Sequence, residues 1–110
     1  MRDDIERLRD ILNAIDHILN KTVGGPSAFN NDEMLQVWVL HHLQIVGEAA
    51  RSLIAEFRQR HPDKVWVKAA GMRNILVHYF EINTTRIWNV VEEDLPSLRD
   101  RVEALLGAQP

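Results

Sequence analysis

An arginine and a histidine, Arg73 and His78, stand five positions apart in the otherwise apolar segment RNILVHYF (73–80). An imidazole can take or give a proton near neutral pH, and a guanidinium can hold a phosphate through two parallel hydrogen bonds. On an ideal α-helix the two positions are about 140° and 7.5 Å apart, whereas Asn74 lies about one turn from His78. The pair therefore either serves a shared groove, completed where needed by a second subunit, or simply ends a helix beside solvent and the carbonyl dipole.

Other catalytic patterns are missing from the sequence. There is no cysteine, which excludes disulfides, cysteine nucleophiles and Cys-ligated metals. The five histidines lack a His-Glu-x-x-His spacing, and no glutamate is followed by histidine three positions later, so we expect no metal site and no cofactor. Phosphate-binding loops and nucleophile elbows are also missing.

The elements that position Arg73 and His78 are predicted to be helices. Apolar residues recur at three- and four-residue steps, which is the period of an amphipathic helix, and no strand pattern is present. The predicted helices are one of about five turns that stops near Lys21, one from about Asp32 to Arg60, one from Val65 through Leu76, and one from Thr84 to Gly107 that Pro96 kinks or divides. Short loops between them predict an all-α, antiparallel bundle of four to five helices.

Length and composition indicate a single domain over residues 1–110, frayed at its last few residues. The sequence has no signal-peptide pattern and no apolar run long enough for a membrane span, so we expect a soluble, cytoplasmic protein. The net charge of −3 hides a basic segment from Arg51 to His78, with six basic residues against two acidic ones. That segment is either a solvated face or a patch that attracts a polyanion.

Residues 66–96, WVKAAGMRNILVHYFEINTTRIWNVVEEDLP, resemble the HepT-like family of HEPN-domain proteins. The resemblance rests on Arg-Asn followed by His, Tyr and Phe at a helix end, with Ala-Gly-Met before them and Asp-Leu-Pro after them. The stretch LQIVGEAA (43–50) resembles the Gly-Glu-Ala that recurs on the family's preceding long helix. The similarity extends over nearly the whole chain, including the order of its helices.

The resemblance implies a homodimeric bundle that acts as a metal-independent endoribonuclease toxin on RNA, whether tRNA or mRNA. In that family the Arg and His of both protomers converge on one cleft, which assigns the catalytic roles to Arg73 and His78. Asn74 and Glu48 match the family's polar positions and are expected to support the site. The apolar stretch 37–46 suits a dimer interface. The expected approach path for RNA consists of Arg51, Lys64 and Lys68.

The resemblance also implies a partner, an MntA-like nucleotidyltransferase antitoxin that transfers AMP to a tyrosine beside the cleft. The family spacing is His-x-Tyr, whereas Tyr79 directly follows His78. Aligned without a gap, Phe80 takes the tyrosine position; with a one-residue deletion, Tyr79 takes it and Trp88 also falls into register. We therefore expect AMPylation at Tyr79, where the added negative charge would repel RNA phosphates.

An alternative function is a non-catalytic dimeric subunit, whose nucleotidyltransferase partner performs the chemistry. The acidic net charge and the shifted position of Tyr79 favour this alternative. Toxicity of the chain expressed without its partner would distinguish a ribonuclease from such a subunit.

Overall fold

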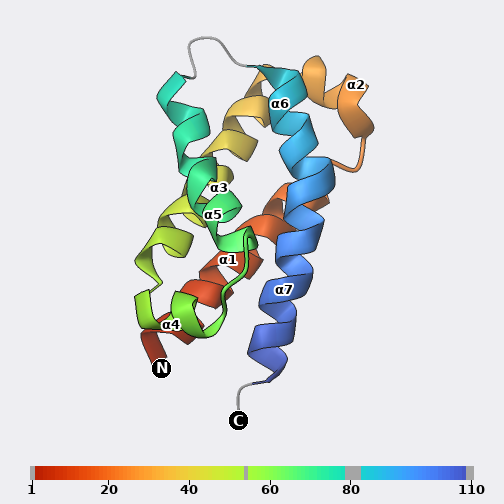
Figure 1. Cartoon of the computed structure of the whole chain (residues 1–110). Coiled ribbons are helices and arrows are strands. Elements are labelled where there is room, and N and C mark those ends of the chain that lie inside the picture. The colour runs from red at the N-terminus through yellow and green to blue at the C-terminus, as the bar shows by residue number, and fades with distance from the viewer. Residues whose placement is uncertain (1, 54, 79–82, 109–110) are drawn as a thin grey trace.

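The computed structural model describes residues 2–53, 55–78 and 83–108, with the backbone alone at 2 and 76–78. These ranges are helical and contain no strand, which confirms the predicted all-α class (Figure 1). None of the helices in them is long and apolar enough to span a membrane. The elements are α1 (Arg2–Lys21), α2 (Gly25–Asn30), α3 (Glu33–Ser52), α4 (Ala55–Arg60), α5 (Val65–Gly71), a 3₁₀ helix η1 (Met72–His78), α6 (Thr84–Asn89), a π-helical stretch η2 (Val90–Asp94) and α7 (Leu95–Gly107).

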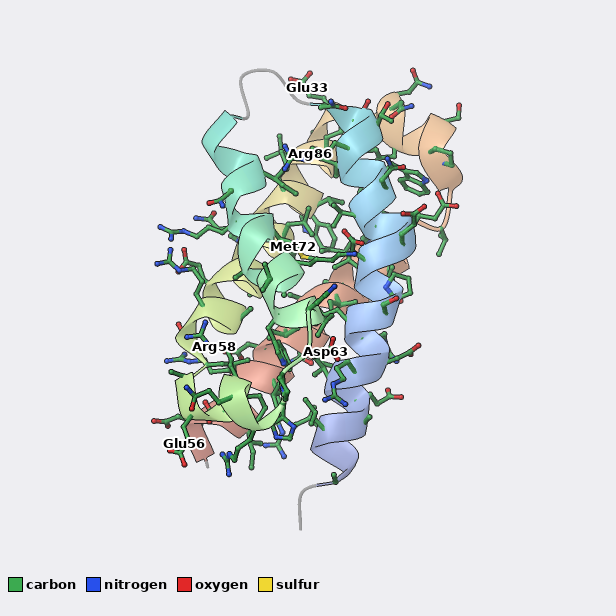
Figure 2. All side chains as sticks on the ribbon, viewed as in Figure 1. Glu33, Glu56, Arg58, Asp63, Met72 and Arg86 are labelled. Carbon is green, nitrogen blue, oxygen red and sulfur yellow. The ribbon has the colours of Figure 1, made fainter. Side chains whose placement is uncertain are left out.

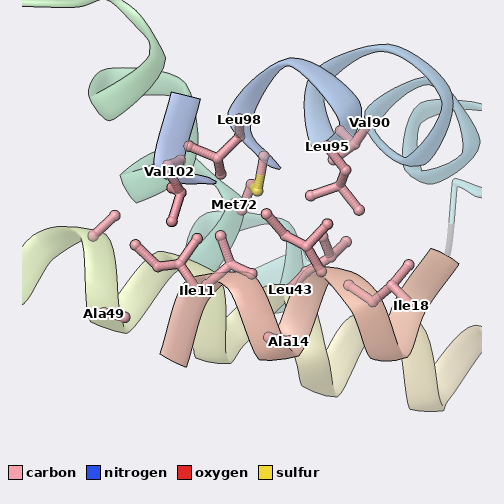
Figure 3. Close-up of a cluster of buried hydrophobic side chains, with 14 of the residues drawn as sticks. Ile11, Ala14, Ile18, Leu43, Ala49, Met72, Val90, Leu95, Leu98 and Val102 are labelled. Carbon is pink, nitrogen blue, oxygen red and sulfur yellow. The ribbon is translucent and has the colours of Figure 1, made fainter. Parts of the chain in front are cut away.

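The core lies between α1, α3 and α7, and α5 and η1 pack onto α3. Ile11, Leu43 and Leu98, one from each of the three long helices, are fully buried (Figure 3). Each such side chain stabilises the fold by roughly 1.5–3 kcal/mol relative to an exposed one. Met72 at the start of η1 reaches the same cluster, so the core directly fixes the segment that carries Arg73 (Figure 3).

Most of the large apolar residues in the stretch 37–46 of α3 pack into the core of the single chain. Val39, Leu40, Leu43 and Val46 are buried in the core. Val37 is the large aliphatic residue of this stretch that remains open to solvent, with an exposed fraction of 55%. The dimer predicted from this stretch therefore has less apolar surface available than the sequence pattern suggested.

The first connection contains a helix that the sequence pattern did not predict. Helix α1 ends at Lys21 as expected, but Pro26 lies in the first turn of α2, where its missing N–H is tolerated. Asp32 then caps α3, because its Oδ1 accepts a hydrogen bond of 3.0 Å from the Leu35 N–H. The buried Gln36 amide donates to the Phe29 carbonyl at 3.0 Å and so ties α2 to α3.

The prediction of one helix from Asp32 to Arg60 is wrong. Helix α3 ends at Ser52, and Leu53 has an extended backbone with φ −61° and ψ 134°. The change of direction buries both Leu53 and Phe57 in the core. The next break falls as predicted, since α4 ends at Arg60, immediately before His61-Pro62.

The last helical rod begins at Thr84, as predicted, and its irregular stretch lies ahead of Pro96. Asn83 Oδ1 accepts a hydrogen bond of 3.0 Å from the Arg86 N–H. Ahead of Pro96 the chain widens into η2, where the Leu95 N–H donates to the Val90 carbonyl five residues back. Pro96 has no N–H to donate, and the wider π-helical turn ahead of it lets the chain continue without that hydrogen bond. Helices α6 and α7 therefore run on through η2 as one rod (Figure 1).

Candidate active site

The segment with Arg73 and His78 lies on η1, which continues α5 as a tighter helix. The predicted α-helical geometry is therefore wrong from Met72 onwards. A 3₁₀ helix turns about 120° and rises about 2.0 Å per residue, so positions 73 and 78 are roughly 10 Å apart along the axis. Positions 74 and 78 are about 120° apart around it, so the predicted alignment of Asn74 with His78 on one face does not follow.

Met72 and Arg73 divide the start of η1 into a buried and an accessible position. Met72 is 2% exposed and packs in the core, whereas the Arg73 side chain is 40% exposed. Since consecutive 3₁₀ residues point about 120° apart, anchoring Met72 in the core directs Arg73 away from it.

Arg73 forms an ion pair with Glu48 of α3. The Nε atom of Arg73 lies 2.6 Å from Oε1 of Glu48. Both side chains are about half exposed, so the pair contributes at most about 1 kcal/mol to stability and acts mainly on orientation. Glu48 holds the Nε edge, and no other described residue pairs with the guanidinium. The two terminal nitrogens remain able to bind an anion in a fork.

Gly47 allows the close approach of η1 to α3 at this point. A Cβ atom at position 47 would lie 2.6 Å from the backbone nitrogen of Arg73 and 2.7 Å from its Cβ. Both distances are shorter than a real Cβ contact, and the first neighbour is backbone. The Gly47-Glu48 pair therefore has two roles: the glycine lets Arg73 approach, and the glutamate binds it.

Asn74 is exposed and lines a groove of about 1020 Å³ beside α4 and α5. Two of the three residues predicted for RNA approach, Arg51 and Lys64, line the same groove. The structure thus brings these two predicted residues together with Asn74, next in sequence to Arg73.

Lys68, the third residue predicted for RNA approach, does not line this groove. Its Nζ is 3.8 Å from Oδ1 of Asp94, and it lines a smaller hollow of about 220 Å³ against α7. An acidic neighbour reduces its availability to phosphate, and Lys64 lines this hollow too, so Lys68 differs from Lys64 in charge environment more than in position.

His78 is the last residue of η1, and its side chain lies outside the described residues, as does the whole of Tyr79. Among the residues that are described, no three histidine, aspartate or glutamate side chains gather in a way that could hold a metal ion. Among them, His17 stacks on His42 with ring centroids 5.3 Å apart, and His41 lies edge-on to His42 at 5.2 Å.

Comparison with known sequences gives a family assignment. The family described as ribonuclease HepT-like matches residues 1–105. The chain belongs to this family. A candidate RNase of Methanocaldococcus jannaschii, MJ1380, is 36% identical over 104 residues, which cover 93% of this chain and 95% of that protein. A candidate ribonuclease HepT of Thermococcus cleftensis is 37% identical over 75 residues, covering 67% of this chain and 68% of the relative. No solved structure matches significantly.

Membership of the HepT-like ribonuclease family gives the exposed Arg73 a chemical context, because ribonucleases act on phosphodiesters.

Sequence reasoning missed two parts of this site. Gly47 was noticed only within the Gly-Glu-Ala motif, and its contact with Arg73 depends on how two helices meet. Arg58 and Val67 also line the groove. Arg58 was visible in the charge count of the basic segment, whereas nothing in the pattern distinguished Val67 from a core residue.

Proposed function

We propose that this HepT-like protein is a metal-independent, RNA-cleaving toxin of a toxin–antitoxin pair, acting as a homodimer in the cytoplasm. The observation that carries the proposal is the arrangement of Arg73, half exposed and held at its Nε edge by Glu48, on the segment that ends at His78. Ribonuclease family membership supports RNA as the substrate.

In this proposal the RNA supplies its own nucleophile. His78 accepts the proton of a 2′-hydroxyl, whose oxygen attacks the neighbouring phosphorus while the bond to the 5′-oxygen breaks. The departing 5′-oxygen takes a proton from a second imidazole, which the other protomer supplies. The free nitrogens of Arg73 bind the phosphoryl oxygens and stabilise their added charge, which replaces the role of a metal ion. DNA is spared because it has no 2′-hydroxyl.

The proposed regulation is AMPylation of Tyr79 by a nucleotidyltransferase antitoxin. Tyr79 follows His78 directly, so a phosphate attached there adds negative charge beside the cleft. Such a charge repels incoming RNA phosphates and blocks cleavage.

Inducible expression in a bacterial host tests the proposed function. We expect the wild type to arrest growth and to produce RNA fragments that end in a 2′,3′-cyclic phosphate, while Arg73→Ala at equal protein level permits growth. Normal growth and intact RNA with both proteins would contradict the proposal and favour a non-catalytic subunit.

Co-expression with the proposed nucleotidyltransferase antitoxin tests the regulation separately. The wild type should gain the mass of AMP on Tyr79 and lose toxicity, whereas Tyr79→Phe should stay unmodified and toxic. Modification of another residue, or rescue of Tyr79→Phe to the same extent as the wild type, would exclude this role for Tyr79.

A further inference from the structure

The groove beside α4 and α5 has an apolar floor that the fold does not explain. Val67 lines it and is 76% exposed, one of the few large aliphatic side chains so open to solvent in the described part of the chain. Ala70, Gly71 and the buried Trp66 line the groove next to it. Its volume of about 1020 Å³ reaches the upper end of the range for small-molecule sites.

The rim of the groove is cationic and its charges are not neutralised. Arg51, Arg58 and Lys64 line it, and none of the three forms an ion pair with another described residue. The acidic residue of the lining, Asp63, pairs with Arg101 of α7, whose Nε lies 3.1 Å from Oδ2. Figure 2 shows Arg58 and Asp63 near the turn between α4 and α5. The groove is therefore electropositive on a chain whose net charge is −3.

We propose that this groove binds unpaired RNA nucleotides that flank the phosphate cut at Arg73, an inference that rests on the proposed ribonuclease function. The apolar floor at Val67 and Gly71 takes the faces of bases, and the cationic rim takes phosphates. A duplex keeps its base faces stacked inside, so it can use the rim but not the floor. Proteins that hold single strands combine a cationic groove with exposed side chains, most often aromatic, that contact base faces, and here the exposed aliphatic Val67 takes that place. Asn74, which lines the groove, directly follows Arg73 in the sequence.

Gly71 lines the groove, as well as a hollow of about 330 Å³ beside α6, and is a place to add bulk. No atom lies within 4 Å of a Cβ built on Gly71, and its φ is not positive, so a larger side chain extends into open space without strain. Gly107 is its matched control, because it also ends a helix, is also open around a built Cβ, and lies on α7 away from the groove.

The experiment measures fluorescence anisotropy of a labelled single-stranded RNA and of the same sequence as a duplex, with full-length His78→Ala protein so that neither is cut. We expect adding Gly71→Leu to weaken single-strand binding about tenfold, because the new side chain occupies space that a base would take and keeps it from Val67, and to weaken duplex binding less than twofold. Gly107→Leu should bind both RNAs as the parent does. Val67→Glu should weaken single-strand binding further, with Val23→Glu as its control, since Val23 is also highly exposed.

Single-strand binding by Gly71→Leu within twofold of the parent would overturn the inference, and so would equal losses for single strand and duplex. Conversion of a dimer to a monomer by Gly71→Leu in sedimentation would overturn it in favour of a second copy of the chain in the groove. Cleavage assays distinguish failure of the groove inference from failure of the proposed ribonuclease function. If the wild type cuts single-stranded RNA and Gly71→Leu cuts it equally well, only the groove inference fails. If the wild type cuts no RNA, the proposed function fails with it.

Discussion

Arg73 Nε lies 2.6 Å from Glu48 Oε1, and the two residues meet because Gly47 leaves no side chain between α3 and η1. The carboxylate binds one edge of the guanidinium, and no other described residue competes for the remaining nitrogens. Glu48 is thus a positioning residue for Arg73. It fixes the orientation of the guanidinium and leaves the two terminal nitrogens able to bind an anion.

Replacing Glu48 by glutamine tests this positioning. Glu48→Gln keeps the size of the side chain but removes its charge, so Arg73 is free to adopt other rotamers. We expect kcat for RNA cleavage to fall about ten- to a hundredfold, with KM changed less. The free energy of unfolding should change by less than about 1 kcal/mol, because the pair is half exposed. Glu56→Gln, on the exposed surface of α4, is the control. Faster cleavage by Glu48→Gln would instead mean that Glu48 restrains Arg73.

A methyl group at Gly47 should disturb both stability and activity. In an ordinary helix interior, replacing glycine by alanine stabilises by roughly 1 kcal/mol. Here the new Cβ lies 2.6 Å from the Arg73 nitrogen, so we expect Gly47→Ala to destabilise by about 1–3 kcal/mol and to displace η1. Urea denaturation of Gly47→Ala beside Gly71→Ala, which has open space, isolates the effect. Equal stability of Gly47→Ala and the wild type would show that the helices separate without penalty.

Arginine at position 73 should be required for its shape and not only for its charge. Lysine keeps the positive charge but has a single ammonium group. It therefore cannot bind Glu48 on one edge and a phosphate on another, as a planar guanidinium can. We expect Arg73→Lys to lower kcat about a hundredfold or more while RNA binding falls only slightly. Arg86→Lys, on the exposed surface of α6, should cleave as the wild type does. Retention of most cleavage by Arg73→Lys would indicate a simple charge effect.

The salt dependence of RNA binding should identify which cations meet phosphates. For single strands the slope of log affinity against log salt changes by about 0.7 for each phosphate contact. Arg51→Gln and Lys64→Gln, both in the groove, should each reduce the slope by about that amount. Lys68→Gln should reduce it less, because Lys68 faces Asp94 and lies outside the groove. A larger effect from Lys68→Gln than from Arg51→Gln would move the RNA path to α7.

The sequence predicted the parts of the fold that depend on local chemistry. The helix limits near Lys21, Arg60 and Thr84 depend on residues within a few positions of them, and they were predicted correctly. The break after Ser52 and the 3₁₀ geometry of η1 were missed, because packing decides them. The amphipathic pattern continues through Leu53, and only the core shows why the chain turns there.

The same distinction between local chemistry and packing applies to the candidate site. Residue types and the family resemblance selected Arg73 and Glu48, but their pairing required the contact between two helices. That contact depends on Gly47, whose role is invisible until η1 is placed on α3. The groove around Val67 was likewise hidden, because an apolar residue on a helix indicates core until its exposure is known.

The most direct test of the central claim is RNA cleavage by the purified, partner-free protein in excess EDTA, with His78→Ala prepared identically. We predict that the wild type cuts single-stranded RNA to products with 2′,3′-cyclic phosphate ends and that His78→Ala does not. No cleavage of several RNAs including tRNA, or equal cleavage by both proteins, would contradict a metal-independent ribonuclease centred on Arg73 and His78.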